Sequence, residues 1–502
     1  MHTTLLLDMA ADAIPDRLAL GPRADGLTFH ELRARARGGA AWLAERGGDT
    51  VAFLGLNGPV LPVALFASGL LAKPFAPLNY RLPDADLNRL LARTAPSVAI
   101  VDDDMIPRLK ACAGVTVVAM TAFEAACLDP AHRETELAYA EPDIAVLLFT
   151  SGTTGEPKAA ILRHGNLTSY VISTVEFLGS DEDEAALVSV PPYHIAGISA
   201  LLTGVYGGRR IVHLEAFTPE TWVEAAAAEA ITHAMVVPTM LGTVLDILEA
   251  RGLTLPALKV LSYGGGRMPG PVIERALRVL PHVDFVNAYG LTETSSTVAV
   301  LGPEDHRAAI ASTDAAVRRR LGSVGRPLPA LELEIRDPDG RLLGPNQSGE
   351  IYVRGEQVSG EYTHKKVVQD DGWFATNDGG WMDEAGYLFV EGRLDDVIVR
   401  GGENISPGEI EDVLRAHPGV ADVAVLGLPD DHWGEQVAAA IVGKDGAPAA
   451  EELAAWVRAR LRSTKTPEVW AFRDALPYND TGKLLRRQLK AEMAGPTKPA
   501  AG

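Results

Sequence analysis

The sequence predicts an α/β protein in which a large N-terminal domain precedes a small α+β C-terminal domain. Its 502 residues exceed the roughly 250–300 that one hydrophobic core usually supports, so more than one domain is expected. Up to about residue 290, short apolar runs alternate with helical patterns, which is typical of doubly wound α/β subdomains. The periodicity changes near residue 321 and again after Arg393, which predicts a small β-barrel-like subdomain and then a compact module.

The N-terminal region supplies the first strands and helices of the doubly wound sheets. Residues 51–54 and 98–101 are short apolar runs, and residues 29–45 and 85–93 have helical periodicity. Residues 222–230 are rich in Ala and Glu and predict a surface helix. Further strand candidates lie at residues 144–149, 188, 235–237, 260–261 and 283–286.

Beyond residue 321, short strand candidates separated by Gly, Pro and Asp predict an antiparallel β unit. These candidates are residues 331–335, 350–353 and 387–391. After Arg393, strand and helix patterns alternate over about one hundred residues, which is the size of a small domain. The predicted helices are 410–416 and 451–462, and the predicted strands are 420–426 and 437–442.

The composition excludes several classes of protein. The net charge of −20 repels phosphate backbones and anionic lipids, so no nucleic acid is expected as a partner, although a local basic pocket is compatible with it. Cys112 and Cys127 form no CxxC pair, so neither a zinc site nor a disulfide framework is expected. The apolar stretch 60–72 is shorter than the roughly 20 residues of a membrane span. We expect a cytoplasmic protein without integral membrane contact, and the oligomeric state stays open.

A polar loop at residues 150–158 follows the apolar run 144–149 and combines hydroxyls, two glycines and Lys158. Glycines let backbone N–H groups approach an anion, and Ser and Thr hydroxyls add donors, so the loop predicts a phosphate site. It is not a Walker A loop, because Lys158 is preceded by Pro157 and followed by Ala159. A polar surface turn is the structural alternative.

Together with this loop, eight later segments resemble, in order, the motifs of the adenylate-forming (AMP-binding) superfamily. This superfamily includes acyl-CoA synthetases, aryl-CoA ligases, peptide-synthetase adenylation domains and luciferases. The resemblance covers about residues 26 to 490. The segments are residues 191–197, 263–266, 287–294, 349–355, 373–378, 392–396, 401–407 and 479–483.

The resemblance implies an acid–thiol ligase that uses ATP, Mg²⁺ and coenzyme A. A carboxylic acid would be joined to AMP with release of pyrophosphate, and the acyl group would then pass to the thiol of coenzyme A. The carboxylate and the ATP phosphates repel each other, so catalysis would be mostly positioning and charge neutralisation. The implied domains are 1–394, which binds ATP and the acid, and the mobile C-terminal domain 395–502, with the hinge at Asp395.

The resemblance also implies the nucleotide site. Tyr289 would stack on adenine, Asp378 would accept hydrogen bonds from both ribose hydroxyls, and Arg393 would contact the ribose. A half-buried core tyrosine and a solvated ion pair are the structural alternatives. The implied ATP- or AMP-binding residues are Thr150, Ser151, Gly152, Thr153, Thr154, Lys158, Gly264, Gly265, Gly266, Asn287, Ala288, Tyr289, Gly290, Thr292, Asp378, Arg393 and Lys483.

The implied catalytic residues are Lys483, Thr292, Glu293 and His194. Lys483 would bridge the acyl carboxylate and the α-phosphate, although a lysine near a chain end is ordinarily a solvated side chain. Glu293 would hold Mg²⁺ together with Thr154, and Thr292 would contact the α-phosphate; a surface Glu is the alternative. His194 would shape the acid site without transferring a proton, since a lone histidine is more often a core or surface group.

Small residues line the implied acyl pocket, which leaves room for a flat ring or an unbranched chain and favours an aryl or fatty acid. The implied pocket consists of His194, Ala196, Ala200 and Gly290, and the implied coenzyme A channel consists of Gly401, Gly402 and Glu403. Two positions depart from the pattern of the family. Asn377 stands where Gly is frequent, and Arg267, which follows three glycines, is interpreted as a solvated arginine rather than an extra cation near the nucleotide.

Two other functions remain open besides an acid–CoA ligase. The first is an adenylating enzyme with a different acceptor or anion, such as a carrier-protein thiol, or nitrite for diazotisation of an aryl amine. The second is a degenerate nucleotide-binding scaffold. The joint presence of Lys158, Glu293, Asp378, Arg393 and Lys483 disfavours the scaffold, because a dead homologue is expected to lose at least one of these charges.

The role implied for Lys483 predicts that the two half-reactions separate in a variant. Lys483→Ala is expected to abolish acid-dependent ATP–pyrophosphate exchange, because the charge that offsets the repulsion is lost. The variant is expected to convert a synthetic acyl-adenylate to the thioester as the wild type does. Normal exchange in this variant would contradict the assignment.

Overall fold

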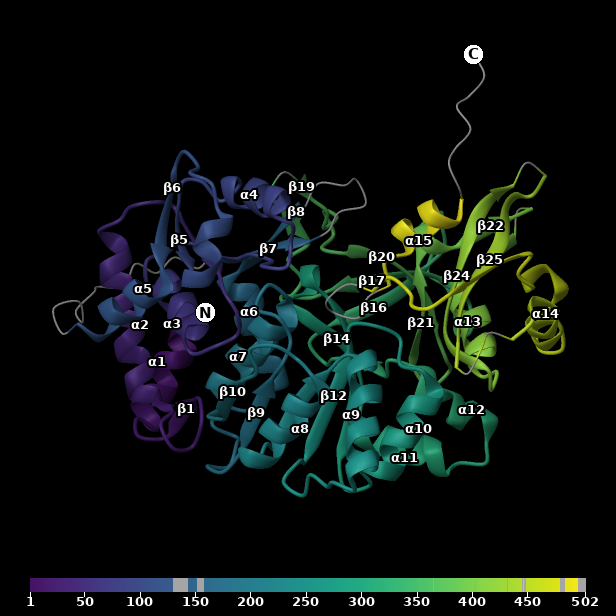
Figure 1. Ribbon diagram of the computed structural model, residues 1–502, viewed down its shortest axis with the longest axis horizontal. Coiled ribbons are helices and arrows are strands. Elements are labelled where there is room, and N and C mark those ends of the chain that lie inside the picture. Colours follow the sequence, from purple (N-terminus) through teal and green to yellow (C-terminus); the bar gives the residue numbers. More distant parts are fainter. Residues whose placement is uncertain are drawn as a thin grey trace, which may run out of the picture.

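The computed structural model of the protein describes residues 1–129, 143–150, 158–363, 365–401, 403–430, 432–444, 446, 448–478 and 484–494 (Figure 1). The N-terminal part fills the left and centre of Figure 1, and the C-terminal part lies at its right.

Two large mixed sheets form the framework of the N-terminal part. The first sheet has parallel pairing from β1 through β10, β9, β11 and β12 to β13, with antiparallel strands at both edges. Its described strands are, in spatial order, β15 (Arg326–Pro327), β14 (Ser296–Leu301), β13 (Asp284–Leu291), β12 (Val260–Gly264), β11 (His233–Val236), β9 (Ala185–Val188), β10 (Arg210–His213), β1 (Leu18–Leu20) and β2 (Leu27–Thr28).

The second sheet has a parallel centre made by β7, β4, β3, β5 and β6, and antiparallel strands extend it beyond β7. All five residues of β5 are buried, as expected for a strand covered on both faces. Its described strands are, in order, β19 (Lys365–Lys366), β18 (Glu361–Tyr362), β8 (Lys158–Arg163), β7 (Ile144–Thr150), β4 (Phe75–Pro77), β3 (Thr50–Leu54), β5 (Ser97–Val101) and β6 (Val115–Ala119).

Helices cover both faces of each large sheet, which confirms the predicted doubly wound α/β class. A core cluster shared by both sheets contains the helices α1 (Thr3–Ala13), α2 (Phe29–Ala44), α3 (Val60–Leu70), α5 (Met120–Leu128), α6 (His164–Thr174) and α7 (Ile195–Gly207). The outer face of the first sheet carries α8 (Pro219–Ala228), α9 (Pro238–Arg251) and α10 (Gly270–Val279). The outer face of the second sheet carries α4 (Asp84–Ala92) and the 3₁₀ helix η1 (Asp103–Arg108).

Three short helical segments follow β14 in the chain, and their bounds are α11 (Pro303–Ala311), α12 (Ala315–Arg319) and η4 (Arg320–Gly322). Local sequence fixes several helix ends. At the start of α2, Thr28 and Glu31 form a reciprocal capping box that satisfies two backbone N–H groups. Within the described ranges, no helix has the length and apolar character that crossing a bilayer requires.

Two smaller sheets complete the molecule. An antiparallel sheet follows the order β16 (Glu332–Arg336), β17 (Gly349–Arg354), β20 (Phe374–Met382) and β21 (Leu388–Arg393). The 3₁₀ helix η5 (Leu394–Asp396) connects it to the C-terminal module. The described elements of that module are β22 (Ile398–Arg400), β23 (Glu403–Ile405), α13 (Pro407–Arg415), β24 (Val420–Asp430), β25 (Gly434–Gly443), α14 (Ala450–Arg458), η6 (Ser463–Lys465), β26 (Val469–Arg473) and α15 (Arg486–Met493).

Several strands and helices near the C-terminus end at other residues than predicted. Strand pairing or a tight turn sets these ends. The strand expected at 420–426 continues to Asp430, because its residues stay paired with β25 as far as Gly434. The helix expected at 451–462 ends at Arg458, and the amides of Arg460 and Leu461 then bond the Val457 carbonyl in a tight turn. The expected strand at 387–391 is β21 and continues to Arg393.

Glycines let the strands β12, β13 and β14 approach each other closely. A Cβ atom on Gly264 would lie 2.3 Å from the carbonyl oxygen of Ala288, and one on Gly290 would lie 1.8 Å from the carbonyl oxygen of Ser296. Real Cβ contacts of this length do not occur, so either substitution forces the backbone to shift. The register of β13 with β14 also changes between Tyr289 and Gly290, as in a β-bulge.

This close approach predicts a stability loss for a small substitution. Gly290→Ala is expected to lower the free energy of unfolding by about 1–3 kcal/mol, because the added methyl overpacks the turn of β13 against β14. Urea denaturation measures the effect. Gly242→Ala in α9 is the control, since its Cβ would meet no atom within 4 Å. Equal stabilities of Gly290→Ala and the wild type would contradict this packing.

Candidate functional site

The predicted nucleotide and acid residues gather at the edge formed by the carboxyl ends of the parallel strands in the first sheet. Gly264 ends β12, Tyr289 and Gly290 lie near the end of β13, and His194 follows β9 at the start of α7. Open α/β sheets bind their ligands at such an edge. The register pairs Gly264 with Ala288, so the predicted glycine loop and the predicted tyrosine segment are neighbours.

A buried carboxylate lies at the centre of this site. The Tyr289 hydroxyl donates to Oδ2 of Asp378 over 2.7 Å, and Nε of Arg393 is 3.0 Å from Oδ1. Asp378 is 7 % exposed, and Arg393 faces it across the β20–β21 pair. Nη1 of Arg393 also donates to the carbonyl of Thr376 over 2.9 Å. This is therefore no solvated ion pair, and a buried carboxylate requires such donors to remain ionised.

Tyr289 supplies one of these donors from the other subdomain. Burial, and next the Asp378 carboxylate, raise the pKa of Tyr289 well above its ordinary value, so the phenol stays protonated at neutral pH. Tyr289 is half-buried, and its hydroxyl is bonded to Asp378. Stacking of its ring on adenine stays a prediction.

Asn377 precedes Asp378 in a left-handed backbone conformation, with φ of 59°. Asparagine is among the few non-glycine residues that tolerate this region, so it can stand where the family frequently has glycine. Its backbone N–H donates to Oε1 of Glu350 over 3.0 Å, and its side-chain amide donates to Oδ2 of Asp395 over 2.9 Å.

Glu293 lies in the 3₁₀ helix η3 (Thr292–Thr294), directly after β13. The Tyr362 hydroxyl on β18 donates to Oε1 of Glu293. The backbone N–H groups of Ser359 and Gly360 donate to the Glu293 carbonyl over 2.8 and 3.2 Å. These contacts hold the carboxylate against a segment of the second sheet. The sequence analysis missed Tyr362, because it lies outside every motif and only the pairing of β18 with β8 brings it here.

The donor set at Glu293 suits magnesium that arrives with a nucleotide. Mg²⁺ usually takes one or two carboxylates and completes its shell with phosphate oxygens and water. In the part of the chain that the structure describes, no group of three or more His, Cys, Asp or Glu side chains could hold a metal. A single carboxylate next to a phosphate-binding edge therefore fits a shared protein–substrate site and not a closed protein cage.

The predicted acyl-pocket residues lie around the start of α7. His194 is the N-cap residue of this helix, and Ala196 and Ala200 follow within its first two turns. The hydroxyls of Ser199 and Ser296 are 3.1 Å apart, which joins α7 to β14 opposite Gly290. The structure thus brings the four predicted pocket residues to one region.

Several predicted residues lie outside the described residues, so their positions stay predictions. The β7–β8 hairpin pairs Thr150 with Lys158 at either end of the phosphate loop, and the Lys158 side chain is exposed. The predicted residues outside the described set are Ser151, Gly152, Thr153, Thr154, Gly402 and Lys483, together with the side chain of Thr150.

Two of the predicted thiol-channel residues, Gly401 and Glu403, belong to the β22–β23 hairpin. Gly401 has a φ of 57° and its N–H donates to the Trp433 carbonyl over 2.8 Å, and a carboxylate oxygen of Glu403 is 3.8 Å from Arg462. Figure 1 shows β22 on the outer side of the C-terminal module, away from the N-terminal part. The predicted hinge residue Asp395 lies in η5, between the two parts.

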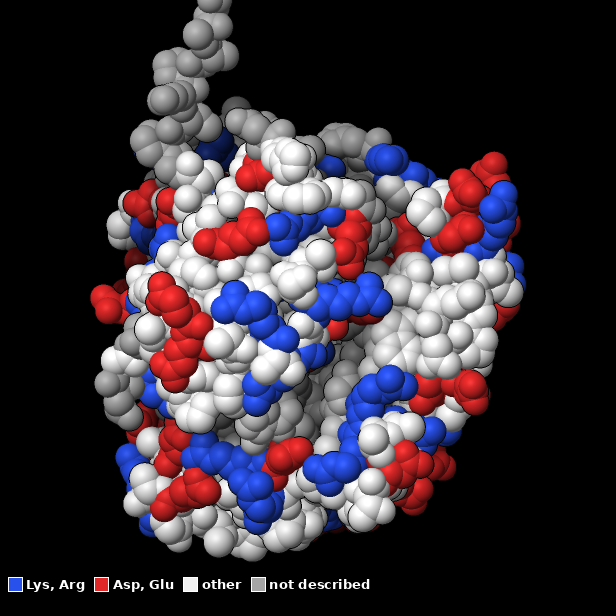
Figure 2. Space-filling view, turned by 90° about the vertical axis from the view of Figure 1, so that its right-hand side faces the viewer, with Lys and Arg blue, Asp and Glu red and all other residues white. Residues whose placement is uncertain are grey.

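The charge distribution differs from what the net charge of −20 alone suggests. Figure 2 shows a furrow on one face of the molecule, and several Lys and Arg side chains lie along its margins with Asp and Glu side chains among them. Local basic groups attract anions at short range even where the total charge is negative. The phosphate site itself stays a prediction.

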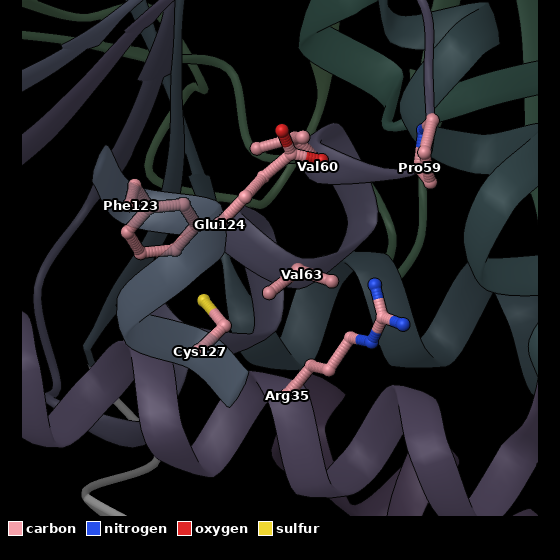
Figure 3. A pocket seen from close by; sticks show the side chains of 7 residues that line it. All are labelled: Arg35, Pro59, Val60, Val63, Phe123, Glu124 and Cys127. Atoms are coloured by element: carbon pink, nitrogen blue, oxygen red, sulfur yellow. The ribbon is translucent and has the colours of Figure 1, made fainter. Parts of the chain in front are cut away.

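A second hollow, seen in Figure 3, lies between α2, α3 and α5 and is lined by Arg35, Val63, Phe123 and Cys127 among others. Burial raises the pKa of the Cys127 thiol to about 12, so it is protonated and unreactive at neutral pH. None of the residues that line this hollow is among the predicted site residues.

Known proteins with similar sequences belong to the family whose motifs this sequence resembles. The sequence profile of the AMP-binding enzyme family matches residues 7–363, and that of the AMP-binding enzyme C-terminal domain matches residues 409–483. Feruloyl-CoA synthase from Amycolatopsis sp is 36% identical over 95% of this chain and 96% of its own. A fatty acid–[acyl-carrier-protein] ligase from Streptomyces coeruleorubidus is 31% identical over 93% of this chain and 92% of its own.

The fold also matches solved structures. O-succinylbenzoate CoA synthetase from Bacillus subtilis, in complex with the acyl-adenylate intermediate OSB-AMP, superposes with a TM-score of 0.83 at 30% identity and covers 97% of both chains. The same synthetase has been solved in complex with ATP and a magnesium ion.

The buried carboxylate predicts a test of nucleotide recognition. Asp378→Asn is expected to raise the KM for ATP by about tenfold to a hundredfold, because hydrogen bonds to a charged group are lost. The variant is also expected to lose the preference for ATP over 2′,3′-dideoxy-ATP, which steady-state kinetics with both nucleotides measures.

Asp339→Asn is the control, because its ion pair with Arg341 is exposed on the same small subdomain. An Asp378→Asn variant that still distinguishes the two nucleotides would contradict a role at the ribose.

Proposed function

The chain belongs to the family of AMP-binding enzymes, and we propose that it is an AMP-forming ligase that joins an aromatic carboxylic acid to coenzyme A. It adenylates a carboxylic acid with ATP, releases pyrophosphate and transfers the acyl group to the coenzyme A thiol. The observation that carries this function is the buried Asp378 carboxylate, held by Tyr289 and Arg393 beside the glycine-lined end of β12 and β13.

Adenylation requires an acid carboxylate to approach the α-phosphate against charge repulsion. Asp378, held by Tyr289 and Arg393, fixes the ribose by accepting hydrogen bonds from its hydroxyls. Glu293 would hold Mg²⁺ together with the phosphates, and the bound metal would supply positive charge against theirs. Lys158 from the N-terminal part and Lys483 from the C-terminal module supply protein cations, so that the reacting groups are held together while negative charge develops on the phosphoryl oxygens.

Thioester formation requires the thiol to reach the adenylate. The hairpin with Gly401 and Glu403 lies on the outer side of the C-terminal module (Figure 1), so a rotation about η5 brings it to the site. Few residues connect the modules at this point, which is typical of a hinge. Coenzyme A is the proposed acceptor, since the relatives named as CoA ligases cover nearly the whole chain.

Two features support an aromatic acid. The start of α7, after His194, carries the small Ala196 and Ala200, and small side chains suit a flat ring. In addition, relatives named for ferulate and o-succinylbenzoate, both aromatic acids, match over nearly full length.

The proposal predicts the products of a defined acid panel. With ATP, Mg²⁺ and coenzyme A, ferulate or another aromatic acid in the panel is expected to give AMP and its thioester in equal amounts. The kcat/KM is expected to exceed that for octanoate and palmitate by about tenfold or more, because a pocket shaped for a ring fits a flexible chain poorly. Mass spectrometry detects AMP, adenylates and thioesters together.

Preference for a fatty acid would contradict the aromatic assignment. Adenylate without thioester would contradict coenzyme A as the acceptor. In that case a carrier protein, and then nitrite with an amino-substituted aromatic acid, are added to identify the acceptor.

A further inference from the structure

Two side chains at which this sequence departs from the pattern of the family, Asn377 and Arg267, both contact the C-terminal module or its hinge. Asn377 lies on β20 beside the buried carboxylate, and Arg267 lies in the loop between β12 and α10. Each belongs to a different subdomain of the N-terminal part. The nucleotide chemistry described above uses neither of them.

The first contact is at the hinge itself. The Asn377 amide donates to Oδ2 of Asp395 over 2.9 Å. Asn377 belongs to a strand of the N-terminal part, whereas Asp395 is in η5, where the chain leaves it. A rotation about the backbone of Asp395 moves its carboxylate relative to β20, so this hydrogen bond breaks or re-forms whenever the module turns.

The second contact spans the gap between the parts. Nη2 of Arg267 pairs with Oδ2 of Asp412 on α13, with exposed fractions of 42% and 44%. The guanidinium also packs on the same helix at Gly408, where a Cβ would lie only 2.5 Å from Nη1. Burial raises the pKa of Asp412, and the Arg267 charge opposes this rise. Arg267 is thus exposed, as expected from the sequence, but it pairs with a carboxylate of the C-terminal module.

We propose that Asn377 and Arg267 form a two-point latch that holds the C-terminal module in the described pose and so controls how readily the enzyme passes from adenylation to thioester formation. In this pose α13 packs on β21, where the Ser406 hydroxyl donates to the Glu391 carbonyl over 3.1 Å. The β22–β23 hairpin then faces outward (Figure 1). Asn377 and Arg267 are positioning residues, and the proposal rests on the proposed function.

Weakening the latch is expected to change the rates of the two half-reactions in opposite directions. The described pose leaves the β22–β23 hairpin, with Gly401 and Glu403, on the outer side of the C-terminal module (Figure 1), so the latch favours adenylation over thioester formation. Weakening the latch lowers the population of this pose and raises that of the rotated pose. Adenylation then slows and thioester formation from a ready-made adenylate accelerates. A merely structural role would lower both rates together.

The variants are chosen so that the backbone conformation at position 377 does not change. Gly and Asp both tolerate the φ of 59° at position 377, so Asn377→Gly and Asn377→Asp remove the amide donor without forcing the strand to change. Arg267→Gln removes the second contact. Arg307→Gln is the matched control, because Arg307 pairs with Asp284 at 52% and 42% exposure within the N-terminal part.

Two rates are measured in the full-length enzyme with the acid identified by the panel: acid-dependent ATP–pyrophosphate exchange, and thioester formation from the synthetic adenylate. The ratio of the second to the first is expected to rise about threefold to tenfold in Asn377→Gly and Arg267→Gln, the range of one hydrogen bond or ion pair. Asn377→Asp is expected to raise it further, because two carboxylates then repel. Arg307→Gln is expected to leave the ratio unchanged.

Limited trypsin digestion gives a readout independent of activity. Cleavage after Arg393 and Arg400, on either side of η5, is expected to be faster in the latch variants than in the control. An unchanged ratio with unchanged cleavage overturns the latch, as does an equal fall of both rates. Absence of thioester from the wild type would instead refute the proposed function, and the cleavage rates would still decide the latch.

Discussion

The architecture of the site depends on a carboxylate buried where two subdomains meet. Asp378 comes from the small antiparallel sheet, Tyr289 from the large parallel sheet, and Arg393 from the last strand before the hinge. An ionised carboxylate in this position is costly unless donors surround it, so the contact specifies how the sheets must meet. Arg393 ends β21 directly before η5, so the buried carboxylate lies next to the predicted hinge.

Much of the fold was predictable because its periodicity is strong. The apolar runs that became β3 and β5 and the helical pattern that became α2 lie where the sequence predicts them. The ends of elements were less predictable. The length of β24, for example, depends on its pairing with β25, and the local sequence of β24 does not reveal that pairing. The motifs named residues without saying how they meet, and the structure places Gly264, Tyr289, Gly290 and His194 at one edge because parallel strands end there. Tyr362 was missed because it reaches Glu293 only through sheet pairing.

Asn377 and Arg267, the two departures from the family pattern, show that a sequence motif does not reveal the contacts a residue makes in the folded protein. Asn377 could be seen in the sequence as an unusual residue, but its left-handed backbone and its bond to Asp395 exist only in three dimensions. Likewise, a solvated Arg267 was the simpler interpretation until α13 was placed against it. Residues of this kind do not alter the chemistry that the family shares. They alter the balance between the poses in which that chemistry takes place.

The central claim is that the chain activates a carboxylic acid through an acyl-adenylate. The most direct test uses ferulate labelled with ¹⁸O in its carboxylate, together with ATP, Mg²⁺ and coenzyme A, and analyses the nucleotide product by mass spectrometry. Attack of the carboxylate on the α-phosphate leaves one labelled oxygen in AMP once the thiol has displaced it. The account predicts AMP that carries one ¹⁸O, with the thioester formed alongside. Thioester accompanied by unlabelled AMP, or by ADP, would contradict it.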